Sequence, residues 1–484
     1  RPVYFTFSNT IYHQLIRGFG RSAEAMESSS VRSRRGDSGS STGAAAAEKN
    51  QAAARVEKEG GATAAMDQSF ILAALDSPSD ENGAQLNVSA GRIQFRVATL
   101  NCWAIPYIWP FGSANRVLRL ERLSDQLMKE QYDVIGLQEL WSEADFLDLA
   151  ARVVTIYPYS HYFHSGFTGS GVSVLSKHPI VSTLMNRYSL NGFAHHIHRG
   201  DWFGGKVVGM AELEVGEMRV HFYSTHLHAE YNRQNDLYLP HRLAQSFELS
   251  QFVRHTSRGA DLVILTGDFN LEPDDLGYRI ILSNTHLLDA WRELHGYTPD
   301  ATAFADGMTC DRPDNCYTKK SMLEKLGDGK RLDYIMYKNG RMHAELTRCE
   351  TTLNRIPGED INFSDHAGVE ATFEIDATER QLSTSWEHNR PLIHDAIQIL
   401  GEGEARASFD RKLFIGLAII LLLCICGSLA LDVHFEYLSP YLSVFRFFIA
   451  LFIAFCLWYG FLGLKMEQKA LKGAKHSMEK LLND

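Results

Sequence analysis

The sequence has few cysteines and no excess of positive charge. Seven cysteines occur among 484 residues, and none forms a CxxC pair or a zinc-ligand spacing. Cys310 and Cys316 could close a small disulfide loop, although their Asp-rich surroundings favour free thiols. Lys and Arg total 48 against 58 Asp and Glu, a formal net charge of -10. These counts indicate a reducing compartment and disfavour a nucleic-acid partner, because the chain as a whole carries no basic field.

Complete motifs of two common enzyme classes are also missing. The only GxSxG pattern, Gly39 to Gly43, lies in low-complexity sequence, which argues against a serine hydrolase. The segment Gly200 to Lys206 has the G-x4-G-K of a Walker A motif, but Val207 follows where a Ser or Thr would bind magnesium. Nucleotide binding is therefore not expected.

Composition divides the first 411 residues into three regions. Residues 1–92 alternate Ser/Arg/Gly runs with Ala-rich tracts and are expected to be a disordered extension, with an Arg- and Ser-rich targeting peptide as the alternative. Residues 93–375 contain short β-branched and aromatic runs separated by helix-like stretches, which predicts one strand-rich α/β or α+β domain. Residues 376–411 are polar and are expected to be a linker, with an amphipathic helix around Pro391 to Leu400.

Two long runs without charge stand near the C-terminus. Residues 413–431 and 447–464 contain 19 and 18 uncharged residues, enough to span a bilayer, so residues 412–465 are predicted to form a two-span hairpin. A buried core hairpin is the alternative. Lys and Arg flank the outer ends of both runs, including the tail 466–484, whereas the connecting segment 432–440 has none. The positive-inside rule then places the catalytic domain and both termini in the cytosol.

Six clusters of polar residues stand at the ends of the apolar runs. In chain order they are Asn101, Glu139, His226, Asp268 with Asn270, Asp333, and Asp365 with His366. A single Asp or Asn after a strand is usually a turn or cap residue, so none of them is informative alone. Together they predict one site, built from loops at one end of a sheet.

The order of these motifs resembles a known superfamily. LNCW, LQELW, STHLHAEYN, GDFN, RLDYI and SDH follow one another as in the endonuclease/exonuclease/phosphatase superfamily, over nearly all of residues 93–375. NGF, GDWFGGKVVG, THLHAEYNRQND and PDDLGYR, with the paired C-terminal spans, are similar to the neutral sphingomyelinases of the small two-span type. The resemblance implies a four-layer sandwich of two packed β-sheets flanked by helices.

The resemblance also implies an activity, the magnesium-dependent hydrolysis of sphingomyelin to ceramide and phosphocholine by an activated water. Glu139 would be the principal Mg²⁺ ligand with Asn101 beside it, since Mg²⁺ prefers a few oxygen ligands and retains several waters. His366 would be the general base and Asp333 would orient it. Asp365 would then face the metal.

The remaining site residues have roles toward water and phosphate in the same resemblance. Asp268 and Asn270 would place the water and bind a phosphate oxygen, and His226 would donate a hydrogen bond to the developing charge. Asp201 and Lys206 would order a substrate-binding loop beside the site. A plain surface ion pair is the alternative for these last two residues.

A membrane tether suits a lipid substrate, because it keeps the enzyme at a high effective concentration of that lipid. The Pro-interrupted stretch Trp103 to Phe111 could dip into the headgroup region or cover the core. The alternatives are a phospholipase C acting on lyso-phosphatidylcholine, lyso-platelet-activating factor or inositol phosphosphingolipids, and a nuclease, which the missing basic stripe disfavours. The resemblance implies the endoplasmic reticulum as the location.

Overall fold

The computed structural model describes residues 92–106, 112–296, 307–321, 324, 329–380 and 389–483. The extension expected over 1–92 lies outside the described residues apart from Arg92, where the first strand begins. Residues 107–111 of the predicted apolar loop also lie outside them.

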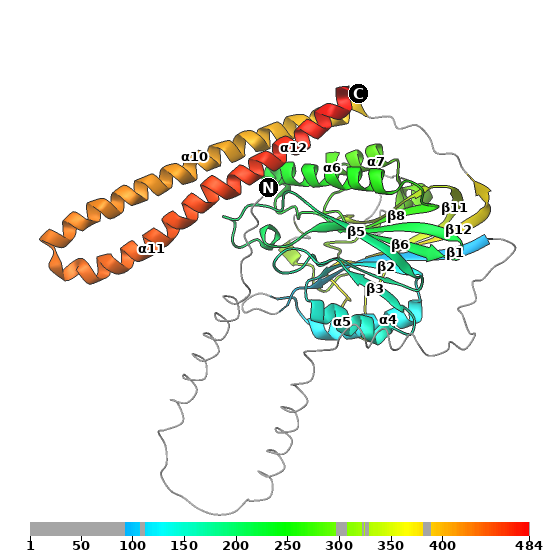
Figure 1. Ribbon diagram of the computed structural model, residues 1–484. Helices are drawn as coiled ribbons and strands as arrows, with labels where there is room; N and C mark the ends of the chain where they lie inside the picture. The colour runs from blue at the N-terminus through cyan, green and yellow to red at the C-terminus, as the bar shows by residue number, and fades with distance from the viewer. Residues whose placement is uncertain are drawn as a thin grey trace, which may run out of the picture. The chain divides into compact units, whose positions relative to one another are not determined.

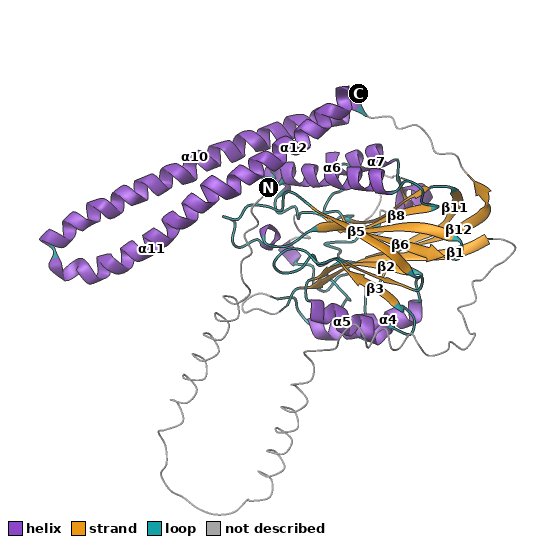
Figure 2. Cartoon of the chain, in the orientation of Figure 1, coloured by secondary structure: helices purple, strands orange, loops and turns teal. Residues whose placement is uncertain are grey.

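Two six-stranded sheets form the centre of the domain (Figures 1 and 2). The first sheet has the strand order β11-β12-β1-β2-β4-β3 and the second β5-β6-β7-β8-β10-β9. In the first, the bounds are β1 Arg92–Ala104, β2 Val134–Leu140, β3 Tyr159–Tyr162, β4 Ser173–Ser176, β11 Met342–Thr352 and β12 Gly368–Arg380. In the second, they are β5 Ile180–Arg187, β6 Val207–Val215, β7 Met218–His226, β8 Leu262–Asp268, β9 Leu288–Asp289 and β10 Asp333–Asn339. Only β1 with β2 and β7 with β8 pair in parallel among the described strands.

Strand β1 shows why the apolar runs of the sequence are continuous. Phe95 and Val97 join the core between the sheets, which includes Phe222 and Ile264 of the second sheet. Ala98, Leu100 and Cys102 join a second core under the outer helices. Successive side chains of a strand point to opposite faces, so a strand that is buried on both faces must be apolar at consecutive positions.

Helices cover the outer face of each sheet. Helices α4 Arg116–Glu130 and α5 Glu143–Val153 pack on the first sheet, and α6 Leu239–Thr256 and α7 Leu276–Thr285 pack on the second. The short α8 Ala290–His295 lies against β10 and β11. The predicted four-layer sandwich is confirmed by this arrangement of helix, sheet, sheet and helix.

The C-terminal part forms two long helices joined by a tight turn (Figure 1). Helix α10 spans Arg390–His434, and after η3 Glu436–Leu438 the chain returns as α11 Ser439–Trp458, the π-helical turn η4 Tyr459–Gly463 and α12 Leu464–Asn483. Both helices are long and apolar enough to cross a membrane, and only 6% and 22% of their most apolar windows are buried. A core hairpin would be mostly buried, so these helices indicate membrane association.

The structure differs from the expected linker over 376–411. Strand β12 continues to Arg380, and residues 390–411 belong to α10 without a break before the apolar run. Ile393, Ala396, Leu400 and Ala407 form a buried stripe against α6, α7 and α12, at the spacing of one helical face. The amphipathic pattern predicted around Pro391 to Leu400 therefore extends further than expected, because Ala407 continues the same buried face.

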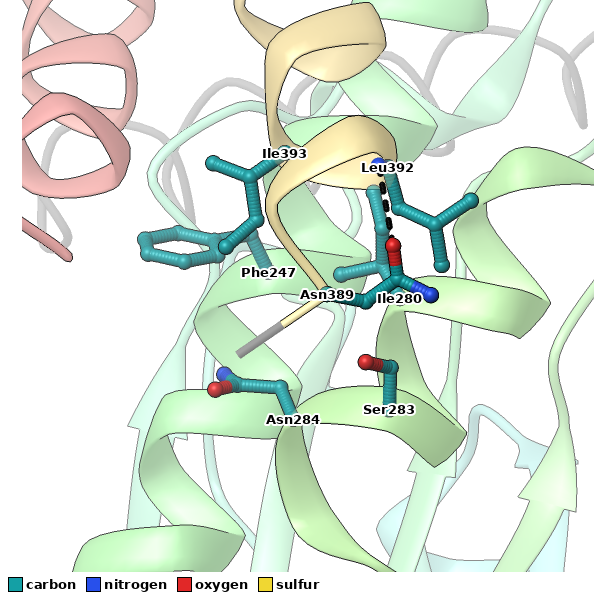
Figure 3. Close-up of a pocket in the computed structure, with 7 residues that line it drawn as sticks. All are labelled: Phe247, Ile280, Ser283, Asn284, Asn389, Leu392 and Ile393. Carbon is teal, nitrogen blue, oxygen red and sulfur yellow. Dashed lines mark hydrogen bonds between the residues drawn. The ribbon is translucent and has the colours of Figure 1, made fainter. Parts of the chain in front are cut away.

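The start of α10 also lines a small pocket on the domain (Figure 3). The side chain of Asn389 accepts a hydrogen bond from Leu392 N at 3.4 Å and caps the helix. The pocket is lined by Phe247, Ile280, Ser283, Asn284, Asn389, Leu392 and Ile393. It belongs to the packing of α10 on α6 and α7, and none of the predicted site residues lines it.

Candidate active site

Three polar side chains stand in one row across the second sheet. His226 of β7 lies opposite Asp268 of β8, and Asp268 lies opposite Asp333 of β10. Strand neighbours in the same register point to the same face of a sheet, so the three side chains meet. All three are buried. The ends of β7 and β8 and the start of the antiparallel β10 thus form one edge of a site.

His366 approaches this row from the loop before β12. Its Nδ1 lies 2.8 Å from Asp333 Oδ2, and its backbone forms a β-bridge with Cys310. Burial alone would lower the pKa of His366, but interactions with Cys310 and Asp333 raise it well above its ordinary value. The Asp333 carboxylate therefore orients the ring and stabilises the imidazolium, the form that exists after a proton is taken from water.

The first sheet contributes Asn101 and Glu139, at a point where the β1–β2 ladder is irregular. The register passes from Asn101 opposite Gln138 to Ala104 opposite Leu140, so Cys102 and Trp103 both lie opposite Glu139. Glu139 has a φ of 55°, which a residue other than glycine rarely adopts. Its Oε1 accepts a hydrogen bond from Asn101 Nδ2 at 3.1 Å.

Asn101 joins the two halves of the site. Its Nδ2 also donates to Asp268 Oδ2 at 2.9 Å, so one amide bridges the carboxylates of both sheets. His226 Nε2 lies 3.5 Å from Asp268 Oδ2 and 3.8 Å from Glu139 Oε1. Asn270, at a φ of 48°, donates its backbone N–H to Asp268 Oδ1 at 2.9 Å. The strand ends of both sheets therefore converge.

Two groups of side chains in this cluster could hold a metal ion. The ligand atoms of Glu139, His226 and Asp268 all lie within 4.8 Å of one another, and so do those of Asp268, Asp333 and His366. Burial and the neighbouring charge of Asp333 raise the pKa of Asp268 to about 7. A divalent cation would offset this concentration of negative charge, so the donor set fits such an ion.

Asp365 lies beside the row rather than in it. Ser364 Oγ donates to Asp365 Oδ1 at 3.2 Å. Burial raises the pKa of Asp365 to about 6, opposed by the charge of His366 and increased by that of Glu139. Asp365 thus interacts electrostatically with both the imidazole and the Glu139 side of the site.

Asp201 and Lys206 form a buried ion pair, so the alternative of a plain surface pair is wrong. Lys206 is 2% exposed and its Nζ lies 2.7 Å from Asp201 Oδ1. Burial alone would raise the pKa of Asp201, but the charges of Lys206 and His228 hold it below its usual range. Tyr231 also donates a hydrogen bond to Asp201.

Lys206 also reaches the row itself. Its Nζ lies 3.1 Å from His226 Nε2 and donates to Leu227 O at 2.6 Å. Burial and the charge of Lys206 lower the pKa of His226 well below its ordinary value, so this imidazole is neutral at neutral pH. The loop that carries Asp201 and Lys206 therefore brings a positive charge next to the predicted phosphate position.

Sequence reasoning missed one buried charge near the site. Arg119 is 1% exposed and donates to four backbone carbonyl groups, on Ala114, Cys102, Phe363 and Trp103. The signal was present, because Arg119 occupies the same buried face of α4 as Leu120, Leu123 and Leu127. An arginine on the apolar face of a helix needs partners inside the protein.

Comparison with known proteins places the chain in a family. The model of the Endonuclease/Exonuclease/phosphatase family matches residues 98–366, more than half of the chain. Human sphingomyelin phosphodiesterase 2 is 40% identical over 345 residues, which are 69% of this chain and 79% of that protein. A Caenorhabditis elegans protein that carries the name of a neutral sphingomyelinase is 56% identical over 403 residues, 81% of this chain and 92% of the relative.

A more distant relative and a solved structure also carry the names of enzymes that act on sphingolipids. The inositol phosphosphingolipids phospholipase C of Schizosaccharomyces pombe is 32% identical and covers 69% of this chain, with 81% of its own length matched. A crystal structure of sphingomyelinase C from Streptomyces griseocarneus aligns with 58% of this chain and 99% of its own, at 20% identity and a TM-score of 0.42, too distant to add to the assignment. As the ordered motifs predicted, the chain belongs to the endonuclease/exonuclease/phosphatase family and, within it, to the neutral sphingomyelinases, which are phosphoric diester hydrolases.

Proposed function

We propose that this protein hydrolyses sphingomyelin to ceramide and phosphocholine, with Mg²⁺ as its cofactor. The observation that carries the proposal is the convergence of Asn101, Glu139, Asp268 and His366 at the strand ends of both sheets, in a chain with 40% identity to human sphingomyelin phosphodiesterase 2. In this reaction the oxygen of a water bonds to phosphorus, the bond from phosphorus to the ceramide oxygen breaks, and ceramide leaves as an alcohol.

Glu139 and Asn101 are the proposed residues for holding Mg²⁺. Their side chains are hydrogen-bonded to each other at 3.1 Å and offer the carboxylate and amide oxygens that suit this ion. The bound ion would supply charge stabilisation for the phosphate oxygens and the leaving oxygen. Asp365 is the further carboxylate proposed on the metal side, which its charge interaction with Glu139 supports.

His366 is the proposed general base. In its neutral form it would take a proton from the attacking water, and its hydrogen bond to Asp333 supports the role because the carboxylate orients the ring and stabilises the imidazolium that forms. Asp268 and Asn270 are proposed to hold the water and a phosphate oxygen, and His226 to donate a hydrogen bond to the charge that develops.

Asp201 and Lys206 are the proposed substrate-binding pair of the neighbouring loop. Lys206 would bind a phosphate oxygen, which its 3.1 Å distance from His226 Nε2 supports. Asp201 would keep the lysine in place through their contact at 2.7 Å. Asn270, whose Nδ2 donates to the same Leu227 O as Lys206 Nζ, would complete the phosphate contacts.

The proposed location of the protein is the membrane of the endoplasmic reticulum, which the chain would cross twice. In this proposal residues 413–431 and 447–464 span the bilayer, and the catalytic domain of residues 93–375 and the basic tail 466–484 face the cytosol. The Lys and Arg residues outside both spans support this orientation. In sealed microsomes the catalytic domain should be digested by added protease, and its protection would overturn the orientation.

A second lipid substrate has support from one relative. The 32% identity to an inositol phosphosphingolipids phospholipase C favours inositol phosphorylceramide as the alternative, because the same phosphoester bond would be cleaved. Lyso-phosphatidylcholine and lyso-platelet-activating factor share the phosphocholine headgroup. Lipid rather than nucleic acid is the proposed substrate class.

The deciding experiment measures phosphocholine release from sphingomyelin in detergent micelles by the full-length protein, with Mg²⁺ or with EDTA. Lyso-phosphatidylcholine, inositol phosphorylceramide and DNA are offered in parallel. His366→Ala should be inactive, whereas His255→Ala, at an exposed histidine on α6, should retain activity. Magnesium-dependent ceramide production would support the proposal, turnover of another lipid alone would change the substrate, and cleavage of DNA alone would overturn the substrate class.

A further inference from the structure

The bulge at the end of β1 leaves two backbone carbonyl groups outside the β1–β2 ladder. Cys102 and Trp103 follow Asn101 directly, and the register with β2 resumes only at Ala104. Trp103 has a φ of 44°, in the left-handed region. Cys102 is 1% exposed, so its carbonyl needs a donor from inside the protein.

Arg119 supplies the donors for both carbonyl groups. Its Nη1 donates to Cys102 O at 2.8 Å and its Nη2 donates to Trp103 O at 2.7 Å. Nη1 donates a second hydrogen bond to Phe363 O at 2.8 Å, and Nε donates to Ala114 O at 2.9 Å. The planar fork of a guanidinium can satisfy this arrangement of acceptors, which a lysine ammonium cannot reproduce.

These four bonds join segments from opposite sides of the candidate site. Cys102 and Trp103 adjoin Asn101, which is hydrogen-bonded to Glu139. Phe363 precedes Asp365 by two residues and His366 by three. The guanidinium also lies over the rings of Trp103 and Tyr317, with its Cζ 5.0 and 5.6 Å from their centroids. One side chain therefore links the loop after β1 to the loop that carries the predicted base.

The loop of His366 is tied to the same cluster a second time. Asn315 Nδ2 donates to Ser364 O at 2.9 Å, and Tyr317, two residues further on, packs against Trp103 with ring centroids 5.0 Å apart. Ser364 Oγ then accepts the backbone N–H of His366 at 3.2 Å. A shift of Arg119 would thus be transmitted to both Asn101 and His366.

The partners of Arg119 argue against a role in stability alone. All four hydrogen bonds go to neutral carbonyl groups, and burial lowers the pKa of the guanidinium. Burying an arginine without a hydrogen-bonded carboxylate costs free energy that apolar packing would not cost. The retained positive charge instead lies within electrostatic range of Asp365 and Glu139.

We propose that Arg119 is a positioning residue for phosphodiester hydrolysis, which fixes the spacing between the metal-binding pair Asn101–Glu139 and the loop of Asp365 and His366. The proposal rests on the proposed function of these four residues. Arg119 itself does not touch the substrate. Its loss should weaken Mg²⁺ binding and slow the chemical step, even in protein that remains folded, because second-layer partners of metal ligands typically contribute about 10- to 100-fold to affinity or activity.

The test compares Arg119→Met and Arg119→Lys with Arg96→Met in the full-length protein in detergent micelles. Arg96 is the matched control, because it ties the other end of α4 to β1 through Glu130 O at 2.5 Å and lies over the Tyr132 ring at 5.0 Å. For each protein, Mg²⁺ affinity is measured by calorimetry. The values of kcat and KM are measured on sphingomyelin at saturating Mg²⁺, and the melting temperature is measured as well.

Arg119→Met should weaken Mg²⁺ binding and lower kcat by about 10- to 100-fold each, with KM changed less than about threefold. Arg96→Met should lose melting temperature but keep Mg²⁺ affinity within about twofold, and Arg119→Lys should fall between wild type and Arg119→Met. If Arg119→Met does not fold, Arg119→Lys decides. Mg²⁺ affinity equal to wild type in the decisive variant, or losses that merely follow melting temperature in Arg119 and Arg96 variants alike, would overturn the proposal.

The same experiment separates this proposal from the proposed function. A wild-type protein that releases no ceramide would contradict the function, whereas the calorimetric comparison of Mg²⁺ affinity would still test Arg119. Conversely, normal wild-type turnover with unchanged Mg²⁺ affinity in Arg119→Met would contradict only the positioning role.

Discussion

The two sheets bring their side chains to the candidate site by different means. The second sheet uses a regular ladder, in which His226, Asp268 and Asp333 are direct neighbours in register. The first sheet uses an irregular one, in which a bulge and a left-handed Glu139 turn the side chains out of the ladder. Regular register follows from alternation along each strand, whereas a bulge needs support from elsewhere, here from Arg119.

Substitution in the irregular half should have the largest effect. Glu139→Gln removes the charge of the proposed Mg²⁺ ligand, so we expect kcat/KM to fall by at least about 10³-fold and stabilisation by Mg²⁺ to disappear. Melting curves with and without Mg²⁺ and turnover of sphingomyelin would measure both effects. The control is Glu121→Gln, on the exposed face of α4, which should change neither kcat/KM nor the stabilisation by Mg²⁺. The neighbouring Gln138 is unsuitable as a control position because it is buried. Full activity in Glu139→Gln would remove Glu139 from the metal site.

In the regular half, Asp333→Asn should reduce kcat by about 10²- to 10³-fold while leaving Mg²⁺ affinity nearly unchanged. The amide keeps the shape of the side chain but cannot stabilise the imidazolium of His366 across the 2.8 Å contact. Steady-state kinetics together with calorimetry would show this separation. A parallel loss of Mg²⁺ affinity would contradict the assignment of Mg²⁺ binding to the first sheet and of proton transfer to the second.

The buried pair beside the second sheet, Asp201 and Lys206, should contribute to stability in addition to its proposed role in substrate binding. Asp201→Asn leaves Lys206 as an unpaired buried cation, and we expect a loss of about 3 kcal/mol in the free energy of unfolding. The double variant Asp201→Asn/Lys206→Met should recover part of that loss, because no charge is then left alone. Urea denaturation of the four proteins of the cycle would measure it. Additive losses would contradict the pairing.

The smallest effect is expected outside both sheets, at Glu467 of α12. Burial and the neighbouring Asp410 raise the pKa of Glu467 to about 8, and His241, whose pKa is lowered well below normal, faces it uncharged at 3.9 Å. The folded state holds a proton that the unfolded state releases above its ordinary pKa of about 4.5, so this contribution to stability falls as pH rises from about 4.5 to 8.

Glu467→Gln should therefore stabilise the protein relative to wild type by at least about 1 kcal/mol at pH 8.5 and change its stability little near pH 4.5. Melting temperatures in detergent at several pH values would test this, with Glu479→Gln on the same helix as the control. Sphingomyelin turnover at neutral pH should be unaffected, since α12 contributes no residue to the two sheets. A stabilisation that does not vary with pH would contradict the assignment.

Much of the fold and of the site could be predicted from the sequence. Continuous apolar runs that end in Asn, Asp, Glu or His indicated buried strands with a polar rim, and the order of those endings matched a known family. The bulge at Cys102 and Trp103 could not be predicted, because the residues themselves do not specify which carbonyl groups leave the ladder. The burial of Asp201 and Lys206 could not be predicted either, because the sequence of an ion pair does not show whether the pair is buried or exposed.

The linker was misjudged for a related reason. Residues 390–411 look polar because only one face of the helix is apolar, and that face is buried by α6 and α7, more than a hundred residues earlier in the chain, and by α12. Ala407 and Gly403 carry little hydrophobic signal, yet Gly403 lets Pro240 approach closely, because an added Cβ would meet Pro240 Cβ at 2.7 Å. Such close packing is a property of two surfaces together and cannot be recognised in one of them.

The uninterrupted helix α10 has a mechanical consequence. Its 45 residues rise about 1.5 Å each, so one helix of roughly 65 Å contains both the segment packed on the domain and the apolar run, with no joint between them. A flexible linker would let a domain sample many heights and angles above a lipid surface. With residues 413–431 in the bilayer, as proposed, the rigid helix would instead hold the domain at a constant orientation to the lipid surface, and substrate lipids would reach the site by lateral diffusion.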